Sequence, residues 1–118
     1  MDSEYYSVPP DTATLINKAK SKRKKITVVG TSAVRTLETV VVSGFQITAK
    51  QGWTDKFIYP PYEFKMSDML ITNFHQPQST LMMLVSAYAN KDFVMHAYQE
   101  AIKKKYRFYS YGDSMLIM

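Results

Sequence analysis

The chain has 118 residues, of which 46% are hydrophobic and 14% aromatic, and this profile indicates one globular domain rather than a disordered segment. No stretch approaches the roughly 18 to 20 apolar residues that span a bilayer, and residues 1–10 lack the basic and apolar regions of a secretory signal. The chain has no cysteine, which excludes disulfides and thiolate metal sites and favours a cytoplasmic location, while its formal net charge of +5 suits a polyanionic partner without requiring one.

The first part of the chain predicts two helices around a short strand. Pro9 and Pro10 open a helix that runs to about Lys22, because proline has no amide hydrogen to lose in the first helical turn. A β-branched strand at residues 26–29 ends at Gly30, and a second helix follows. The first helix ends in a basic cluster: Lys18, Lys20, Lys22, Arg23, Lys24 and Lys25. This cluster is either a solvated helix end with a favourable dipole interaction or a contact for nucleic-acid phosphates.

The middle of the chain predicts a ribbon, a strand and a core helix. Residues 45–48 and 56–59 alternate between apolar and polar side chains, which predicts two strands divided by a turn at Gln51 and Gly52. Residues 69–72 predict a strand buried on both faces. A helix over about residues 80–89 is apolar nearly all round, as a core helix is.

A last helix and strand complete the predicted fold. Asn90 or Asp92 caps the helix, and its apolar side consists of Phe93, Val94, Ala97, Tyr98, Ala101 and Ile102. His96 falls on its polar side, and residues 114–118 predict a final strand. Helices that alternate with short apolar strands indicate an α/β fold, with helices packed on a short-stranded mixed sheet.

The turn at Gly30 is the first candidate binding site. A glycine turn that opens a helix leaves free amide groups, which favour an anion, and Thr31 and Ser32 lie in this turn. Arg35 and Glu38 lie three residues apart on one helical face. They form either a surface ion pair or a site for the carboxylate and amine of an amino acid. We expect Arg35 to point toward the same cleft as Thr31 and to bind an anionic group.

A second candidate site surrounds Trp53, the only tryptophan of the chain. Trp53 either closes the core or stacks on a purine-like base. Thr54 and Asp55 follow it, and a carboxylate such as that of Asp55 reads donor groups on a base edge.

The third candidate site is the polar segment after the strand at residues 69–72. It contains Asn73, His75 and Ser79, and Ser79 also suits the N-cap of the following helix. α/β folds place ligands at the ends of strands, and histidine takes and returns a proton near neutral pH. We therefore predict that His75 is a catalytic residue. The alternative is a structural histidine that satisfies backbone groups in a loop.

Generic catalytic and metal-binding motifs are absent from the sequence, but five longer blocks are informative. They are SEYY (3–6), GTSAVRTLE (30–38), GWTDKFIYPPYEF (52–64), LITNFHQPQSTLMMLVSA (70–87) and YRFYSYGDSMLI (106–117). In this order and spacing the blocks resemble the S-adenosylmethionine:tRNA ribosyltransferase-isomerase family, and the resemblance covers essentially the whole chain. The chain departs from the usual family pattern at Asp2 (histidine), Ser32 (threonine), Pro61 (glycine) and Ser114 (alanine). The lost histidine matters most if the family uses it for binding or proton transfer.

The resemblance implies a cytoplasmic enzyme of queuosine biosynthesis. Such an enzyme transfers and isomerises the ribosyl part of S-adenosylmethionine onto the aminomethyl-deazaguanine wobble base of a tRNA, giving epoxyqueuosine. S-adenosylmethionine is then consumed as a substrate, no metal is implied, and the tRNA anticodon stem-loop is the partner.

Family members are longer than this chain, so residues 1–118 are expected to be one domain, the C-terminal part of a larger α/β domain that is inactive alone. The missing N-terminal part is then a partner, and the uncovered surface favours self-association. Tyr5, Tyr6 and residues 57–64 are the candidates for that surface. Two alternatives remain: a non-catalytic RNA-binding module of the same fold, or a chain with no independent function.

Overall fold

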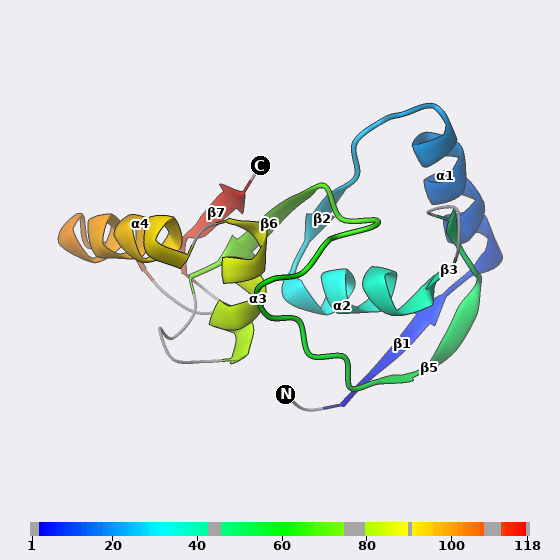
Figure 1. Cartoon of the computed structure of the whole chain (residues 1–118), viewed down its shortest axis with the longest axis horizontal. Coiled ribbons are helices and arrows are strands. Elements are labelled where there is room, and N and C mark those ends of the chain that lie inside the picture. The colour runs from blue at the N-terminus through cyan, green and yellow to red at the C-terminus, as the bar shows by residue number, and fades with distance from the viewer. Residues whose placement is uncertain (1–2, 43–45, 75–79, 90, 108–111, 118) are drawn as a thin grey trace.

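The computed structural model describes residues 3–42, 46–74, 80–89, 91–107 and 112–117, and in these ranges the chain forms four helices and seven strands. Helix α2 (Thr31–Val40) lies at the centre and contacts two separate groups of strands (Figure 1). One is a ribbon of β1 (Glu4–Val8) and β5 (Lys50–Thr54), and the other is a sheet of β2 (Thr27–Val29), β6 (Met69–Asn73) and β7 (Ser114–Ile117). The predicted α/β fold is confirmed.

The three-stranded sheet is mixed, as predicted. Its order is β2-β6-β7, with β2 parallel to β6 and β7 antiparallel to β6. The amide of Gly30 donates to the carbonyl oxygen of Ile71 at 2.8 Å, which continues the ladder past the end of β2. Because β2 and β6 are parallel, the Gly30 turn and the carboxyl end of β6 lie at the same edge of the sheet.

The ribbon differs from the prediction. β5 contains Gln51 and Gly52, which were predicted to form a turn, and it pairs along its length with β1, which was not predicted. β4 (Gln46–Ile47) pairs with β3 (Val41–Val42), while residues 55–59 follow β5 without strand structure. The predicted strand at residues 45–48 is thus confirmed in part as β4, with residue 45 outside the described ranges. The predicted strand at residues 56–59 is wrong, and so is the pairing of the two segments.

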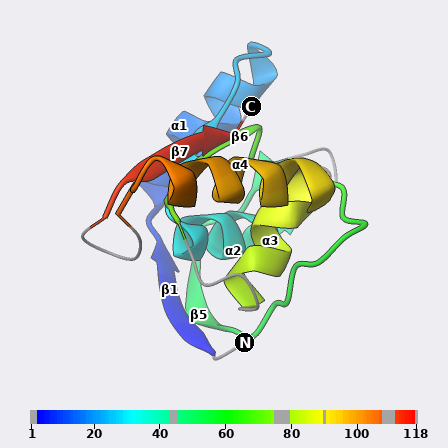
Figure 2. The same ribbon diagram turned by 90° about the vertical axis from the view of Figure 1, so that its left-hand side faces the viewer.

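The predicted helices are confirmed. α1 (Pro10–Ser21) lies beside β4, and α3 (Thr80–Tyr88) packs against α4 (Lys91–Lys103), which crosses in front of it in Figure 2. On α4, Val94 and Tyr98 are buried, but Phe93 and Ile102 are 68% and 59% exposed, so the predicted apolar face is only partly covered. No helix in the described ranges is long and apolar enough to cross a membrane.

α1 and α4 end in the same way, with a basic residue in the left-handed conformation. Arg23 has φ 59° and Lys105 has φ 62°, and the amide of the residue after each donates to a carbonyl oxygen five positions earlier, at 3.0 and 2.9 Å. This is the Schellman arrangement, in which glycine is the usual left-handed residue. A side chain with a Cβ costs free energy in this conformation, so both ends carry strain.

Candidate functional site

A buried arginine holds a partly exposed carboxylate where β1 meets the first turns of α2. Arg35 is 2% exposed and pairs through Nη1 with Oε1 of Glu4, whose side chain is 40% exposed. Nε of Arg35 donates to the carbonyl oxygen of Lys56 at 3.0 Å, and Nη2 donates to that of Thr54 at 3.4 Å. Ser32 Oγ donates to the other carboxylate oxygen of Glu4 at 2.5 Å. The fork of Arg35 thus fixes the Glu4 carboxylate at the surface. We call Glu4, Ser32 and Arg35 the Glu4 cluster.

This geometry changes the interpretation of Arg35. The predicted alternative of a surface ion pair between Arg35 and Glu38 is wrong, because these residues are only 2% and 3% exposed. The guanidinium does bind a carboxylate, but it belongs to Glu4 of the same chain. The charged group that faces outward is therefore Glu4, which sequence reasoning missed although it lies in the SEYY block. A carboxylate in an alternating segment directly before two prolines was the available signal.

Glu38 anchors the segment after β5 to helix α2. Its Oε1 accepts hydrogen bonds from Tyr62 Oη at 3.2 Å and from the amide of Lys65 at 3.0 Å. Its Oε2 accepts the amides of Met66 and Ser67 at 2.9 and 3.2 Å and the hydroxyl of Ser67 at 3.3 Å. Burial, reinforced by the Glu38 carboxylate, raises the pKa of Tyr62 above its usual range. Glu38 is thus bound by donors of its own chain.

The Gly30 turn has the predicted form. Gly30 has φ 92°, a conformation that L side chains rarely adopt, and a Cβ added there would meet no atom within 4 Å. Conformation rather than space therefore requires the glycine. Thr31 is half-buried and Ser32 is exposed, and no side chain caps the helix at Gly30.

Trp53 lies on the outer face of the ribbon. It is 71% exposed, so the alternative that it closes the core is wrong. Tyr5 lies opposite on β1 and is 56% exposed, with the two ring centroids 5.6 Å apart in an edge-to-face arrangement. Asp55 is exposed next to this pair, whereas Thr54 is 4% exposed and shares a 2.7 Å hydrogen bond with the hydroxyl of Thr39. Trp53 and Asp55 are thus available to a ligand, and Thr54 serves the interior.

The exposed aromatic residues continue beyond the ribbon. Phe57 and Tyr59 are 42% and 51% exposed, and their ring centroids are 5.2 Å apart. We call Tyr5, Trp53, Phe57 and Tyr59 the aromatic strip. Tyr6, which was also predicted to be uncovered, is 6% exposed, so that prediction is wrong. The reason is alternation along β1, which turns Tyr5 outward and Tyr6 inward.

The third candidate site is only partly described. Asn73 ends β6, and its Nδ2 donates to the carbonyl oxygens of Gly112 and Asp113, each at 3.3 Å. His75 and Ser79 lie outside the described residues. His96 is exposed on α4, as predicted. Within the described part of the chain, no group of three or more His, Cys, Asp or Glu residues is placed to hold a metal ion.

Comparisons with known proteins agree on one family. The profile of the family described as "Queuosine biosynthesis protein" matches residues 1–117. The chain is 55% identical over 117 residues to the S-adenosylmethionine:tRNA ribosyltransferase-isomerase of Natranaerobius thermophilus, covering 99% of this chain and 34% of that protein. The protein of the same name from Desulfitobacterium hafniense is 57% identical over 118 residues, with 100% of this chain and 35% of that protein covered.

A solved structure gives the same result. The crystal structure of S-adenosylmethionine tRNA ribosyltransferase from Thermotoga maritima matches with a TM-score of 0.89 and 52% identity, covering 97% of this chain and 40% of that chain. The chain thus spans about a third of the length of its curated relatives. Since the family profile covers residues 1–117, the chain belongs to the queuosine biosynthesis protein family.

Proposed function

We propose that this chain forms part of a cytoplasmic tRNA-modifying enzyme that uses S-adenosylmethionine as a substrate. In the proposed reaction, the ribosyl moiety is transferred to the aminomethyl-deazaguanine wobble base and isomerised to give epoxyqueuosine. The observation that carries this proposal is the family match over residues 1–117, together with the relatives' names. Because the chain spans only about a third of those relatives, we propose that residues 1–118 are the C-terminal part of the α/β domain and are inactive alone.

The Glu4 cluster is the proposed contact for the reacting sugar or amine. A carboxylate held by a buried guanidinium accepts hydrogen bonds from ribose hydroxyls or from an aminomethyl group without having to reorganise. Arg35 is then a positioning residue that acts through Glu4. Thr54 holds the end of β5 against α2, and Glu38 holds residues 65–67 against the same helix. Ser32 binds the carboxylate from the first turn of α2, and Thr31 precedes it as the first residue of that helix.

The base-binding part is proposed to be Trp53 and Asp55. Trp53 is exposed enough to stack on a base, and Asp55 lies next to it with its side chain exposed. Tyr5 supports the tryptophan from the neighbouring strand through their edge-to-face contact. Asn73 would approach from the edge of the sheet at which β6 ends, and His75 and Ser79 are proposed members of the same site from the sequence.

Proton transfer is assigned to His75 as a prediction from the sequence. The attacking aminomethyl nitrogen has to lose a proton, and a histidine side chain is suited to accept it near neutral pH. Asn73, two residues earlier, ends β6 at the edge of the sheet where the Gly30 turn lies. This proximity supports a role in the same site.

The remaining proposed partner is the part of the enzyme that the longer relatives have and that this chain does not contain. Large apolar side chains outside the proposed base-binding part are uncovered in several elements: Leu15, Phe57, Tyr59, Phe93, Ile102 and Leu116. We propose that a further part of the enzyme covers this surface, and that the isolated chain self-associates through it. Sedimentation of the chain at increasing concentration tests this, and a strictly monomeric chain contradicts it.

A chimera tests the proposed function. Residues 1–118 replace the matching segment of the Desulfitobacterium hafniense protein, and adenine release is measured with S-adenosylmethionine and precursor-bearing tRNA. The chimera should turn over while the isolated chain releases no adenine above background. In the chimera, His75→Ala should lower turnover by about 10² to 10⁴ with the fold intact.

Matched variants distinguish a specific effect of the proposed site residues from the effect of changing any exposed side chain. Glu4→Gln and Trp53→Ala should each reduce kcat/KM, whereas Glu63→Gln makes the same change as Glu4→Gln at an exposed position elsewhere and should have little effect. An inactive chimera that folds and still binds the stem-loop would favour a non-catalytic RNA-binding module. Equal effects of the site and control variants would remove the Glu4 cluster and Trp53 from the site.

A further inference from the structure

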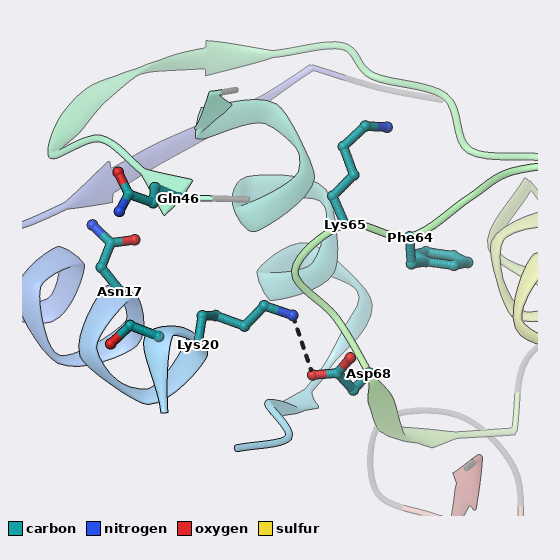
Figure 3. A pocket seen from close by; sticks show the side chains of 7 residues that line it. Asn17, Lys20, Gln46, Phe64, Lys65 and Asp68 are labelled. Carbon is teal, nitrogen blue, oxygen red and sulfur yellow. Dashed lines mark ion pairs between the residues drawn. The ribbon is translucent and has the colours of Figure 1, made fainter. Parts of the chain in front are cut away.

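A pocket between α1 and the segment before β6 shares no residue with the Glu4 cluster or the aromatic strip, but Lys20 of the basic cluster lines it. Its volume is about 480 Å³, and it is lined by Asn17, Lys20, Ser21, Gln46, Phe64, Lys65 and Asp68. Figure 3 shows α1 on one side and residues 64–68 on the other, with Lys20 reaching across the space toward Asp68. We call it the α1 pocket.

The walls of the α1 pocket are held in place by hydrogen bonds. The side chain of Asn17 binds both backbone groups of Ile47, donating to its oxygen at 2.9 Å and accepting from its nitrogen at 2.8 Å, so α1 is fixed to β4. On the opposite wall, Glu38 accepts the amide of Lys65, and Asp68 accepts the amide of Ile26 at 2.7 Å. A pocket whose walls are already ordered loses little conformational entropy when it binds a ligand.

The charge of the α1 pocket favours an anion. Lys20 and Lys65 both line the pocket, against one carboxylate, that of Asp68. The ion pair of Lys20 with Asp68 is long, at 3.7 Å, with both side chains partly exposed, while the Lys65 ammonium lies over the ring of Tyr62, 5.5 Å from its centroid. Asp68 also binds the amide of Ile26, so its charge is shared. Directly after α1, whose Lys20 and Ser21 line the pocket, the exposed residues 22–25 add four positive charges.

These features fit a chain of phosphates better than a single phosphate ion. The carboxylate of Asp68 repels a small dianion such as inorganic phosphate. A phosphodiester carries only one negative charge, and an RNA strand with one phosphodiester in the pocket can also bring neighbouring phosphates to residues 22–25. Phe64 adds an apolar surface for a sugar or base. We propose that the α1 pocket binds a phosphodiester of an RNA strand, with residues 22–25 contacting the neighbouring phosphates. This inference rests on the proposed function and gives the proposed enzyme a site for the sugar-phosphate backbone of its RNA substrate.

The test is the salt dependence of RNA binding by the 118-residue chain. An unmodified anticodon stem-loop is used without S-adenosylmethionine, so the result is independent of ribosyl transfer. Binding is followed by fluorescence anisotropy between about 50 and 200 mM salt. Lys20→Gln with Lys65→Gln is compared with Lys103→Gln with Lys104→Gln, which removes the same charge from exposed positions at the end of α4.

The pocket variant should lower the slope of log K against log salt by about 1 to 2 and weaken binding about tenfold, while the α4 variant changes binding less than about twofold. Asp68→Asn keeps an acceptor for Ile26 and should strengthen binding, and inorganic phosphate should compete weakly. Circular dichroism checks that each variant is folded. Equal losses in both lysine pairs, no loss in the pocket variant, or no RNA binding by the unmodified chain overturns the proposal.

Discussion

Replacing Glu38 should destabilise the fold more than any change to an exposed carboxylate. Glu38 is 3% exposed and accepts the amides of Met66 and Ser67, which are themselves buried. Glu38→Ala leaves these two amides without an acceptor, at a cost of about 1 to 3 kcal/mol each. The loss of about 2 to 6 kcal/mol is a large share of the roughly 5 to 15 kcal/mol that stabilises a domain.

The variant Glu38→Gln tests how much of the effect comes from the charge of the Glu38 side chain rather than from its shape. The amide has nearly the same shape as the carboxylate, but its NH₂ group faces amide donors, so we expect a smaller loss of about 1 to 3 kcal/mol. Glu63→Gln makes the same change at an exposed position in the same segment and should alter stability by less than about 0.5 kcal/mol.

Urea unfolding gives the midpoint for each variant, and hydrogen exchange reports on the amides of Met66 and Ser67 directly. The wild type and Glu63→Gln should be equally stable, Glu38→Gln less stable, and Glu38→Ala the least stable. Both Glu38 variants should show faster exchange at the amides of Met66 and Ser67. A Glu38→Gln protein with the wild-type midpoint and wild-type exchange would refute the reasoning. The Glu38 carboxylate would then contribute little to holding residues 65–67 against α2.

Three further predictions follow from the structure. Arg35→Lys keeps a charge but loses the fork that joins Glu4 to two backbone carbonyl groups, so urea unfolding should show a loss of about 2 to 3 kcal/mol, and an unchanged midpoint would contradict this. Lys105→Gly relieves the left-handed strain at φ 62° and should raise stability by up to about 1 kcal/mol, whereas a lower midpoint would show that the position is unstrained. The raised pKa of Tyr62 means that above pH of about 10 the unfolded state releases a proton that the folded state keeps, so stability should fall as pH rises. Tyr62→Phe should make this fall less steep, and an identical pH profile would contradict the assignment.

The helices and the mixed sheet could be predicted because their signals are local. α1 begins at a proline, α2 follows a glycine with positive φ, and β6 is an apolar run beside polar residues. The ribbon of β1 and β5 could not be predicted in this way. Lys50–Thr54 contains a glycine and polar residues, and it forms a strand because it pairs with a distant segment.

Residues 56–59 show the opposite case. Ile58 is buried between exposed Phe57 and Tyr59, so the alternation is real, but the segment has no strand partner. Burial periodicity alone therefore does not distinguish a strand from an extended loop. For the site, sequence reasoning found Arg35, because a helix shows which residues share a face, but not its partner Glu4, which lies 31 positions away.

The pairing of β1 with β5 also bears on how the protein folds. Its partners are far apart in sequence, from Val8 with Lys50 to Glu4 with Thr54, so the loop-closure entropy is lost before any ladder bond forms. A two-stranded ribbon is marginal alone and needs the surface of α2 to dock on. We expect the ribbon to join a preformed core late in folding, so that the Glu4 carboxylate reaches Arg35 only when the rest of the domain is complete. Chains that stop short of this last step would retain most of their secondary structure and yet lack the candidate site.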